Sequence, residues 1–485
     1  PLRHMLSQII KVYEQNWEGL AYIGISSLFA FLYLPFLLFS RRKQLRSFIE
    51  QNKNTRTLLI LAVSSVILLV FSMGYPFKWG MQWILDMIPL IEQFRSPGRF
   101  AWVFYYVATI ASTIILSKYF LLKVNAYLSG ILVSVILLLF MVEGLPFHQQ
   151  IKTWGFSKNC FNEHNLDEEL KQVCAAIDKV KPQAIIPLPF FHMGTDYFCF
   201  NATEKIKTAT FITAFHTGTP VLGNCTDRTS INEARAEIQL VGSSLLRKEM
   251  SKFIHSDKPF CVLYSKEKLE EGEAGVLDRG RTLLETQNFI VKEILPAELF
   301  KDDIAMYMQC FKENEKNKVF VNELYQTEKS YVRYVGYDSL RGTLVGNLNE
   351  KCVLADIAQN ALEKDKVYEL GFWYDLLGKD ELANTVIVEE IGVNGVVTDT
   401  LAKKSCSQMP NIAGNRLLAL VNFKTSNPQN KIRVSLTGGK DNRGIFRLDN
   451  LLIRRKDVDV YQINSAAHLK EGGKVRVNNF EISNR

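Results

Sequence analysis

Residues 73–100 read MGYPFKWGMQWILDMIPLIEQFRSPGRF, and this stretch decides the organisation of the N-terminal part because it separates two strongly apolar runs. It is rich in tryptophan and proline and ends with Arg95 and Arg99. Aromatic residues and prolines of this kind are typical of the lipid headgroup layer, where arginine meets anionic phosphate. We therefore expect a loop at a membrane surface that contains an amphipathic helix over residues 79–91.

The apolar runs around this loop predict an α-helical transmembrane region over residues 1–146, with helices at 20–39, 58–73, 100–122 and 127–142. The first run stops at Arg41-Arg42-Lys43, and further basic residues follow it. Basic loops stay in the cytoplasm, so the loop after the first helix is predicted to be cytoplasmic. Four crossings then place the loop over residues 74–99, and everything after residue 146, on the outside.

Composition excludes some classes of function. The formal charge is +8, from 58 basic and 50 acidic residues, and much of the excess lies beside the predicted helices. A clustered basic face is the mark of a nucleic-acid-binding protein, so no nucleic acid is expected as a partner. All eight cysteines follow residue 159, and no pair has CxxC spacing, so no metal site is predicted. Disulfides and buried free thiols both remain open.

Residues 147–311 alternate short apolar runs with amphipathic ones, which predicts an α/β domain outside the membrane. Helices are expected at residues 166–180, 230–246 and 266–285, and strands at residues 183–189, 209–213, 220–222, 259–264 and 290–294. Loop residues such as His192, Asp227 and Ser230 could form a hydrolase triad. Because no nucleophile elbow of the form G-x-S-x-G is present, hydrolase chemistry is not favoured.

Residues 319–465 change to short alternating segments with turn residues between them, which predicts an all-β sandwich or jelly roll, followed by a tail over residues 466–485. The expected strands lie at residues 331–336, 342–348, 366–374, 385–397, 416–423, 431–437 and 444–454. The chain is therefore predicted to be a multi-domain membrane protein with a helical bundle, an α/β domain and a β-sandwich.

Within the predicted sandwich, residues 367–375 read VYELGFWYD. Side chains alternate between the two faces of a strand, so the even-numbered residues from 368 to 374 share one face and Glu369, Trp373 and Asp375 share the other. An aromatic ring beside carboxylates suits a sugar, which stacks on the indole and hydrogen-bonds through its hydroxyls. The alternative is that Trp373 packs in the core of the sandwich.

Short strings along the chain carry resemblances to known families. The stretch IPLIEQFRSPGRF at residues 88–100 resembles the later helices of bacterial GT-C class integral membrane glycosyltransferases and their relatives. The strings IIPLPFF at 185–191 and DRTS at 227–230 are similar to the extracytoplasmic domain that follows those helices. The strings YELGFWYD at 368–375 and FRLDNLLI at 446–453 resemble jelly-roll carbohydrate-binding modules.

The GT-C resemblance implies sugar transfer from a polyprenyl-phosphate carrier to a glycan or glycoprotein acceptor, on the periplasmic side of a bacterial inner membrane. Arg95 and Arg99 would hold the carrier phosphate; the alternative is that they only contact lipid headgroups. The family's acidic residue, used with or without a divalent metal, belongs to a first outside loop that we expect upstream of Pro1. Asp86 and Glu92 are the only carboxylates in the loop over residues 74–99 and the only candidates here for a general base.

Two functional hypotheses follow. The first is the C-terminal part of a polyprenyl-phosphate-sugar-dependent glycosyltransferase, with the lipid bilayer, a lipid-linked sugar and an acceptor glycan as partners and no cofactor held by this chain. The second is a non-catalytic, membrane-anchored protein that binds glycans or other envelope proteins, which is motivated by the missing acidic loop.

Overall fold

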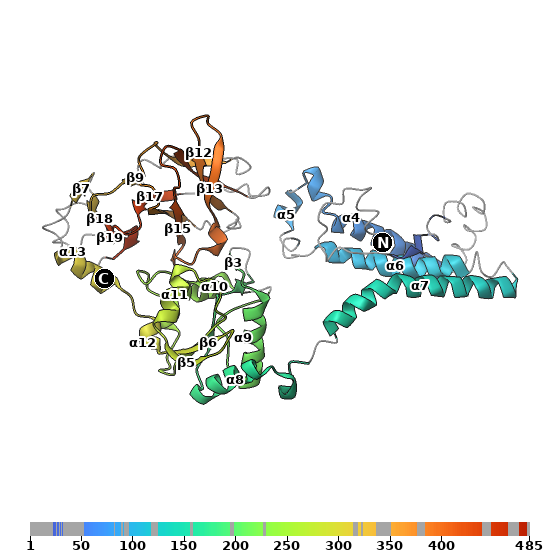
Figure 1. Cartoon of the computed structure of the whole chain (residues 1–485). Coiled ribbons are helices and arrows are strands. Elements are labelled where there is room, and N and C mark those ends of the chain that lie inside the picture. Colours follow the sequence, from blue (N-terminus) through green and yellow to red (C-terminus); the bar gives the residue numbers. More distant parts are fainter. Residues whose placement is uncertain are drawn as a thin grey trace. The chain divides into compact units, whose positions relative to one another are not determined.

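The computed structural model describes residues 23–25, 27–28, 30, 32, 53–81, 83–88, 91, 97–117, 125–155, 159–194, 198–226, 229–313, 319–321, 324–335, 351–375, 384–438, 448–463 and 475–482. The chain divides into two units, Pro1–Lys158 and Asn159–Arg485 (Figure 1). The first contains helices, and the second combines an α/β part with β-sheets.

Three helices account for most of the described part of the first unit: α4 (Lys53–Ser72), α6 (Ala101–Ile115) and α7 (Ala126–Gly155). Leu, Ile, Val and Phe dominate their sequences, so each is helical without a charged face. Helix α4 packs against α6 and against the short helix η4 (Pro97–Phe100) that precedes α6. The Phe71 and Phe100 rings meet edge to face, with centroids 5.2 Å apart.

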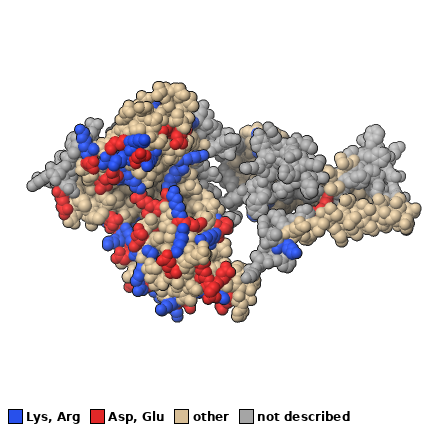
Figure 2. Space-filling view, viewed as in Figure 1, with Lys and Arg blue, Asp and Glu red and all other residues tan. Residues whose placement is uncertain are grey.

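The predicted bundle of four spans is not supported by the structure. Among the described residues, one segment, Ala126–Leu145 of α7, is long and apolar enough to cross a membrane, and none of its most apolar window is buried. The apolar helix over Thr57–Ser72 is shorter, and α6 has 15 residues. Most of the run predicted at 20–39 lies outside the described residues. Figure 2 shows α7 as a surface with few charges, unlike the second unit.

The loop over residues 74–99 does not contain the single amphipathic helix predicted at 79–91. It contains a 3₁₀ turn, η2 (Phe77–Trp79), and a short helix, α5 (Trp83–Met87). Gly80 ends the 3₁₀ turn with a φ of 86°, a left-handed conformation that interrupts a helix. The sequence places Pro89 two residues after Met87, where it disfavours a longer helix.

In the second unit, the α/β part is built on a four-stranded sheet in the order β1-β4-β6-β5. The strands are β1 (Ile185–Leu188), β4 (Phe260–Tyr264), β5 (Arg281–Glu285) and β6 (Ile290–Ile294). Strands β1 and β4 are parallel and the other pairs are antiparallel. Helices α8 (Glu168–Val180) and α9 (Glu204–Thr217) bury one face of the sheet in a shared hydrophobic cluster.

Several predictions for this part are confirmed: the helix at 166–180 and the strands at 183–189, 259–264 and 290–294. The strand predicted at 209–213 is wrong, because these residues lie in α9, which buries Ile206, Ala209 and Thr213 at helical spacing. The helix predicted at 266–285 is two elements, α11 (Glu271–Asp278) and β5. The helix predicted at 230–246 is shorter: α10 (Ile231–Ile238) continues only as the 3₁₀ turn η8 (Gln239–Val241).

Two antiparallel sheets form the predicted β-sandwich, in the orders β10-β16-β12-β13 and β14-β15-β11-β17-β9. The strands are β9 (Val332–Val335), β10 (Cys352–Ile357), β11 (Val367–Asp375), β12 (Thr385–Ile391), β13 (Val397–Ser405), β14 (Ile412–Ala413), β15 (Arg416–Lys424), β16 (Lys431–Thr437) and β17 (Leu448–Arg455). Apolar side chains from both sheets are buried in one cluster, as alternation predicts. Strand β10 was not predicted, and residues 342–348 lie outside the described residues.

A third sheet, in the order β20-β19-β18-β8-β7, was not predicted. It consists of β7 (Val319–Val321), β8 (Leu324–Gln326), β18 (Val460–Ile463), β19 (Val475–Val477) and β20 (Phe480–Glu481). With helix α13 (Ile304–Glu313), it covers part of the outer face of the sheet that contains β11. The outer face is therefore not an open surface.

The α/β part and the sandwich pack together, and α10 and α11 lie between them (Figure 1). The Gln239 side chain donates to the Ile412 carbonyl at 2.7 Å, and Lys404 pairs with Glu270 at 2.8 Å. A Cβ on Gly272 of α11 would lie 2.0 Å from the Val241 carbonyl oxygen, so this glycine allows α11 and η8 to touch. The two parts form one rigidly packed unit with a shared core.

Candidate functional site

A cavity of about 600 Å³ lies within the second unit, between the α/β part and the sandwich. Its wall comes from the loop after β1, from the segment over residues 240–248, from α11, from the loop over residues 408–411, and from β11, β15 and β17. The loops after the parallel strands β1 and β4 contribute to it, and the carboxyl ends of parallel strands are where α/β proteins place ligands. Its volume falls within the range of small-molecule sites.

Glu273 of α11 fixes the α/β side of this wall. Its carboxylate accepts the Phe190 N–H at 2.7 Å and the Glu270 N–H at 2.8 Å, and Glu270 is the N-cap of the same helix. These bonds join the end of β1 to the start of α11. Burial raises the pKa of Glu273, although the backbone N–H donors oppose that shift.

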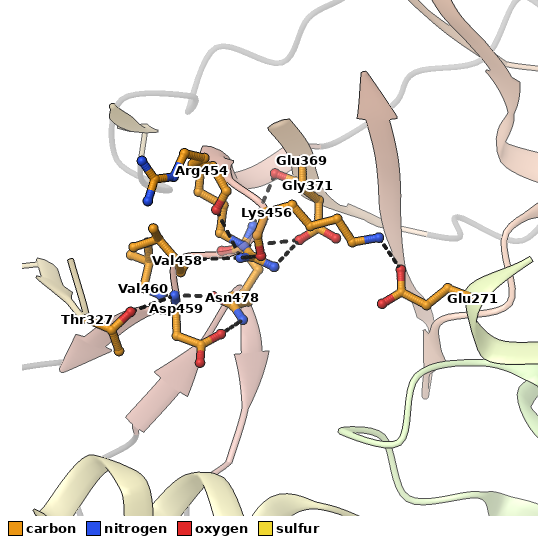
Figure 3. Close-up of polar contacts among 12 residues, drawn as sticks. Glu271, Thr327, Glu369, Gly371, Arg454, Lys456, Val458, Asp459, Val460 and Asn478 are labelled. Atoms are coloured by element: carbon orange, nitrogen blue, oxygen red, sulfur yellow. Dashed lines mark hydrogen bonds and ion pairs between the residues drawn. The ribbon is translucent and has the colours of Figure 1, made fainter. Parts of the chain in front are cut away.

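On the sandwich side, the wall contains a buried ion pair between neighbouring strands. Arg454 of β17 donates from Nε at 3.1 Å and from Nη2 at 2.7 Å to Oε1 of Glu369 on β11, and both side chains are less than one-tenth exposed. The Arg454 Nη1 donates to the carbonyls of Lys456 and Val458 at 2.8 and 2.9 Å. These hydrogen bonds give acceptors to all three nitrogens of the guanidinium, so the pair forms a fixed, polar part of the wall (Figure 3).

Figure 3 also shows how the chain beyond β17 is held. Lys456 reaches Glu271 of α11 at 2.6 Å, which ties the sandwich to the α/β part. Asn478 accepts the Val460 N–H at 2.9 Å and donates to Asp459 at 2.8 Å. These contacts hold the side chain of Asn478 in place, and Asn478 also lines the cavity.

Lys248 is the most buried cation of the cavity wall, at 5% exposure. Its Nζ donates to the carbonyls of Gly242 and Ser243 at 2.7 and 2.9 Å. Burial, and to a smaller extent the nearby positive charge of Arg279, together lower the pKa of Lys248 to about 7. The ammonium is therefore close to its titration point at neutral pH.

The arrangement suits a polar, hydroxyl-rich ligand. Amide side chains such as Asn422 and Asn478 offer both donors and acceptors, and the half-buried ring of Tyr307 adds aromatic surface to the same cavity. Sugars use both, because their hydroxyls hydrogen-bond and their C–H faces pack on rings. No group of three or more metal-ligating side chains occurs in the part of the chain that the structure describes.

The structure places Trp373 away from this cavity. The side chain is 6% exposed and lies in the cluster between the outer face of the β11 sheet and the third sheet. Its Nε1 donates to the Asn479 carbonyl at 3.0 Å, and the Arg416 guanidinium lies 5.2 Å from the ring centroid. Trp373 is thus a packing residue, but on the outer face of the sheet and not between the two sandwich sheets as the alternative assumed.

The two carboxylates grouped with Trp373 have different surroundings. Glu369 is buried against Arg454 and lines the cavity. Asp375 pairs with Arg416 at 3.0 Å, and Arg416 also binds Asp449 at 2.9 Å. The structure therefore brings Glu369 to the candidate site but not Trp373 or Asp375.

The predicted phosphate-binding loop is only partly described. Arg99 lies in η4 and is exposed. Arg95 and Glu92 lie outside the described residues, and of Asp86 only the backbone, in α5, is described. Their roles stay predictions.

Of the residues considered for a hydrolase triad, the two that the structure describes do not contact each other. Ser230 caps α10, accepting the Glu233 N–H at 3.2 Å, and His192 is buried with Nδ1 3.0 Å from Glu237. Asp227 lies outside the described residues. Both described side chains thus have structural partners of their own.

Sequence reasoning missed Lys248 and Arg454. Lys248 lies in a polar run, SSLLRKEM at residues 243–250, that gives no sign of burial. Arg454 follows the apolar run NLLI in a predicted strand, and a charge there is a signal that it faces a buried partner. Pairing it with Glu369 requires the register of β11 against β17, which the sequence does not show.

Residues 1–142 match the model of a domain of unknown function (DUF6311). No curated protein matches the chain.

Among solved structures, the chain is similar to three proteins with carbohydrate-binding modules. The CBM22-1 xylan-binding domain of a Paenibacillus barcinonensis xylanase is 15% identical over 27% of this chain and 85% of its own, with a TM-score of 0.18. The CBM22-1–GH10 modules of Clostridium thermocellum xylanase 10B, complexed with xylohexaose, are 16% identical over 24% of this chain, with a TM-score of 0.16; the chain spans about a quarter, 27%, of that protein. The C-terminal CBM6 of a Zobellia galactanivorans laminarinase is 10% identical over 26% of this chain and 100% of its own, with a TM-score of 0.17. Likeness at these scores carries no argument about what this chain binds.

Proposed function

We propose that this chain is a membrane-anchored glycan-binding protein whose second unit holds carbohydrate in the cavity between the α/β part and the sandwich. The observation that carries the proposal is the make-up of the cavity wall. It joins fixed hydrogen-bonding groups, such as Glu369 and Asn478, to the half-buried ring of Tyr307. Fixed polar groups favour binding because they lose little conformational entropy when a ligand arrives.

Helix α7 supports the membrane anchor. Its segment Ala126–Leu145 has the length and hydropathy of a span, and large apolar side chains such as Leu138 and Met141 are exposed at 61% and 69%. An apolar surface of this kind is stable in hydrocarbon and costly in water. On this ground we propose that α7 anchors the chain in a membrane. The placement of the second unit on the extracytoplasmic side of a bacterial membrane stays a prediction from the basic run at residues 41–43.

The test uses the full chain in detergent micelles and a panel of oligosaccharides, with binding measured by titration calorimetry. Gly275 offers a variant that narrows the cavity without disturbing the core, because it lines the cavity on α11 and an added Cβ meets nothing within 4 Å. Gly275→Trp would add a large ring at the cavity wall. Thr208→Trp, at an exposed position on α9 outside the cavity, is the matched control.

We expect that at least one oligosaccharide binds to the wild type, and that Thr208→Trp binds the same oligosaccharide with unchanged affinity. Gly275→Trp should weaken that binding roughly ten-fold or more, since losing the aligned contacts of one sugar ring costs a few hydrogen bonds. If no sugar binds, or if Gly275→Trp binds as well as the wild type, the assignment of the cavity to carbohydrate is wrong.

A second function is favoured by the turn before α6. The packing of Phe100 on Phe71 fixes η4, and Arg99 lies in that turn, two residues before α6 begins. Arg95 and Arg99 would hold the phosphate of a lipid-linked sugar, in the C-terminal part of a glycosyltransferase. Replacing both arginines with glutamine should abolish transfer of a polyprenyl-linked sugar in membranes and leave the amount of inserted protein unchanged. Unaltered transfer would remove this role.

A further inference from the structure

Every carboxylate that lines the cavity has a partner within the protein, but two of the lysines that line it form no ion pair with the described residues. Five carboxylates line it, and each has a partner within the protein. The partners are Lys404 for Glu270, Lys456 for Glu271, the Phe190 and Glu270 N–H groups for Glu273, Arg279 for Asp303, and Arg454 for Glu369. Four of these carboxylates therefore pair with a cation, and Glu273 is held by backbone N–H groups alone.

Two cations of the wall form no close ion pair among the described residues, although the charge of Lys268 helps to lower the pKa of Glu270. Neither Lys248 nor Lys268 forms an ion pair with any residue that the structure describes. Lys268 is exposed, whereas Lys248 is almost fully buried. A buried ammonium without a counter-ion is costly, and the lowered pKa of Lys248 reflects that cost. An anionic group bound in the cavity would stabilise the charged form of this lysine.

The hydrogen bonds of Lys248 agree with this. An ammonium has three N–H donors, and two of them are directed at the Gly242 and Ser243 carbonyls. No third acceptor lies within hydrogen-bonding distance among the described residues. The two carbonyls also hold the Nζ in place, so the remaining donor has a fixed position at the wall.

We infer that the ligand of this cavity is an acidic sugar, whose ring bears a carboxylate or phosphate group, and that Lys248 is the counter-ion of that group. This inference rests on the proposed function and narrows it from carbohydrate in general to anionic carbohydrate. Lys268, at the exposed side of the same cavity, adds a second positive charge that attracts the ligand as it enters.

Binding of an acidic sugar should change the protonation state of Lys248. The pKa of free Lys248 is about 7, and an anion in contact with it raises that pKa. At pH 8 the empty cavity holds a mostly neutral lysine, so binding an acidic sugar takes up about one proton. At pH 6 the lysine is already charged, and the uptake from this group falls close to zero. Arg279 is the charged group that acts on Lys248 most strongly. The other titratable or charged groups that line the cavity are Lys268, Glu270, Glu271, Glu273, Asp303, Tyr307, Glu369, Lys404 and Arg454.

These neighbours respond differently. The pKa of Glu273 lies above its usual value, so uptake by Glu273 would grow toward pH 5 and not toward pH 8. The pKa of Tyr307 is raised above 10 by burial, and this phenol stays protonated throughout the range. The pH dependence of proton uptake therefore separates Lys248 from the groups around it.

The experiment is titration calorimetry on the full chain in detergent micelles, at pH 6 and pH 8, in buffers with different ionisation enthalpies. Three probes are compared: an oligosaccharide that contains uronic acid, a neutral oligosaccharide of the same length and linkage, and inorganic phosphate alone. We expect the acidic oligosaccharide to bind roughly 10- to 100-fold more tightly than the neutral one, which is the value of one charge-assisted contact. About one proton should be taken up at pH 8. Phosphate alone should bind weakly at the same site and compete.

Two variants complete the test. Lys248→Met should remove the preference for the acidic probe and the proton uptake, provided that it folds. Lys268→Gln changes an exposed residue and should lower the affinity for the acidic oligosaccharide by about three-fold, without changing the proton uptake. Because the proton count is measured on the wild type, the inference is tested even if Lys248→Met does not fold.

The failures of the two proposals are distinguishable. Equal affinity for the acidic and neutral oligosaccharides, with no proton uptake at pH 8, would overturn the role of Lys248 and leave carbohydrate binding intact. Absence of binding for both oligosaccharides would overturn the proposed function. Tight binding of phosphate alone, with no gain from the sugar, would show an anion site that is not a sugar site.

Discussion

The two faces of strand β11 are covered by different kinds of structure. The even-numbered residues from 368 to 374 are all buried between the two sheets of the sandwich, where they form part of one apolar core. On the other face, Glu369 is paired with Arg454, and Trp373 is packed under the third sheet and α13. Both faces are buried, but only the second is covered by elements that carry polar groups.

This difference shows why the cavity lies where it does. A core between two sheets excludes water through close packing of apolar side chains. The outer face is covered by separate elements, the α/β part on one side and the third sheet on the other, and they leave about 600 Å³ of space. Lys404–Glu270 and Lys456–Glu271 pair across the seam between the sandwich and the α/β part. Function is expected at the seam and stability in the core.

The largest effect is expected at the buried ion pair. Arg454→Met removes the guanidinium and leaves the Glu369 carboxylate buried without a partner, which should lower the free energy of unfolding by about 3–5 kcal/mol. Chemical denaturation of the full chain in micelles, followed by tryptophan fluorescence, measures it. The double variant Glu369→Gln with Arg454→Met should recover much of the loss. A single variant as stable as the wild type would show that the pair is not buried in solution.

The contact between α11 and η8 comes next. Gly272→Ala places a methyl group 2.0 Å from the Val241 carbonyl, so it should cost about 2–3 kcal/mol, as overpacking does. Gly275→Ala, on the same helix, meets nothing within 4 Å and should stabilise the protein by up to about 1 kcal/mol. The same denaturation measurement applies to both. Equal stabilities would mean that α11 does not lie against η8.

Stability should also change with pH through Lys248. Its pKa is about 7 in the folded protein and 10.5 without the shift, so the unfolded chain binds more protons between these values. The free energy of unfolding therefore rises with pH in this window, by about 2 kcal/mol between pH 7 and pH 9. Lys248→Met should lack this rise, whereas Lys268→Gln should keep it. An identical pH profile in Lys248→Met would place the titration elsewhere.

The smallest effect is expected at Trp373. Trp373→Phe removes the Nε1 donor of the Asn479 carbonyl and should cost about 1–2 kcal/mol without changing sugar affinity. If Trp373 stacked on a sugar, the same change would instead weaken binding and leave stability unaltered. Parallel measurements of affinity and denaturation midpoint decide between the two.

Periodicity predicted much of this fold because it reports which residues share a face. The alternation in VYELGFWYD assigned both faces of β11 correctly, and the runs at 185–188 and 260–264 gave the two parallel strands. It failed at residues 209–213, where Thr, Phe and Ile favour a strand but the burial of Ile206 and Thr213 follows a helix. Local propensity was overridden there by packing on the sheet.

The candidate site was harder to predict because it depends on contacts between distant segments. Glu369 and Arg454 are 85 residues apart, and Lys248 lies on a segment with no periodic pattern. The third sheet uses strands of two to four residues, which are too short to give a pattern. The sequence therefore left open whether the face of β11 that carries Trp373 binds sugar or is packed, because it could not show which elements cover that face.

The central claim is that carbohydrate occupies the cavity of the second unit. Hydrogen exchange of the full chain, measured by mass spectrometry with and without a bound oligosaccharide, tests it most directly. We predict slower exchange over η8 and the segment that follows it to residue 248, and over α11, because these line the cavity. Protection confined to the β12–β13 hairpin, or none at saturating oligosaccharide, would contradict the account.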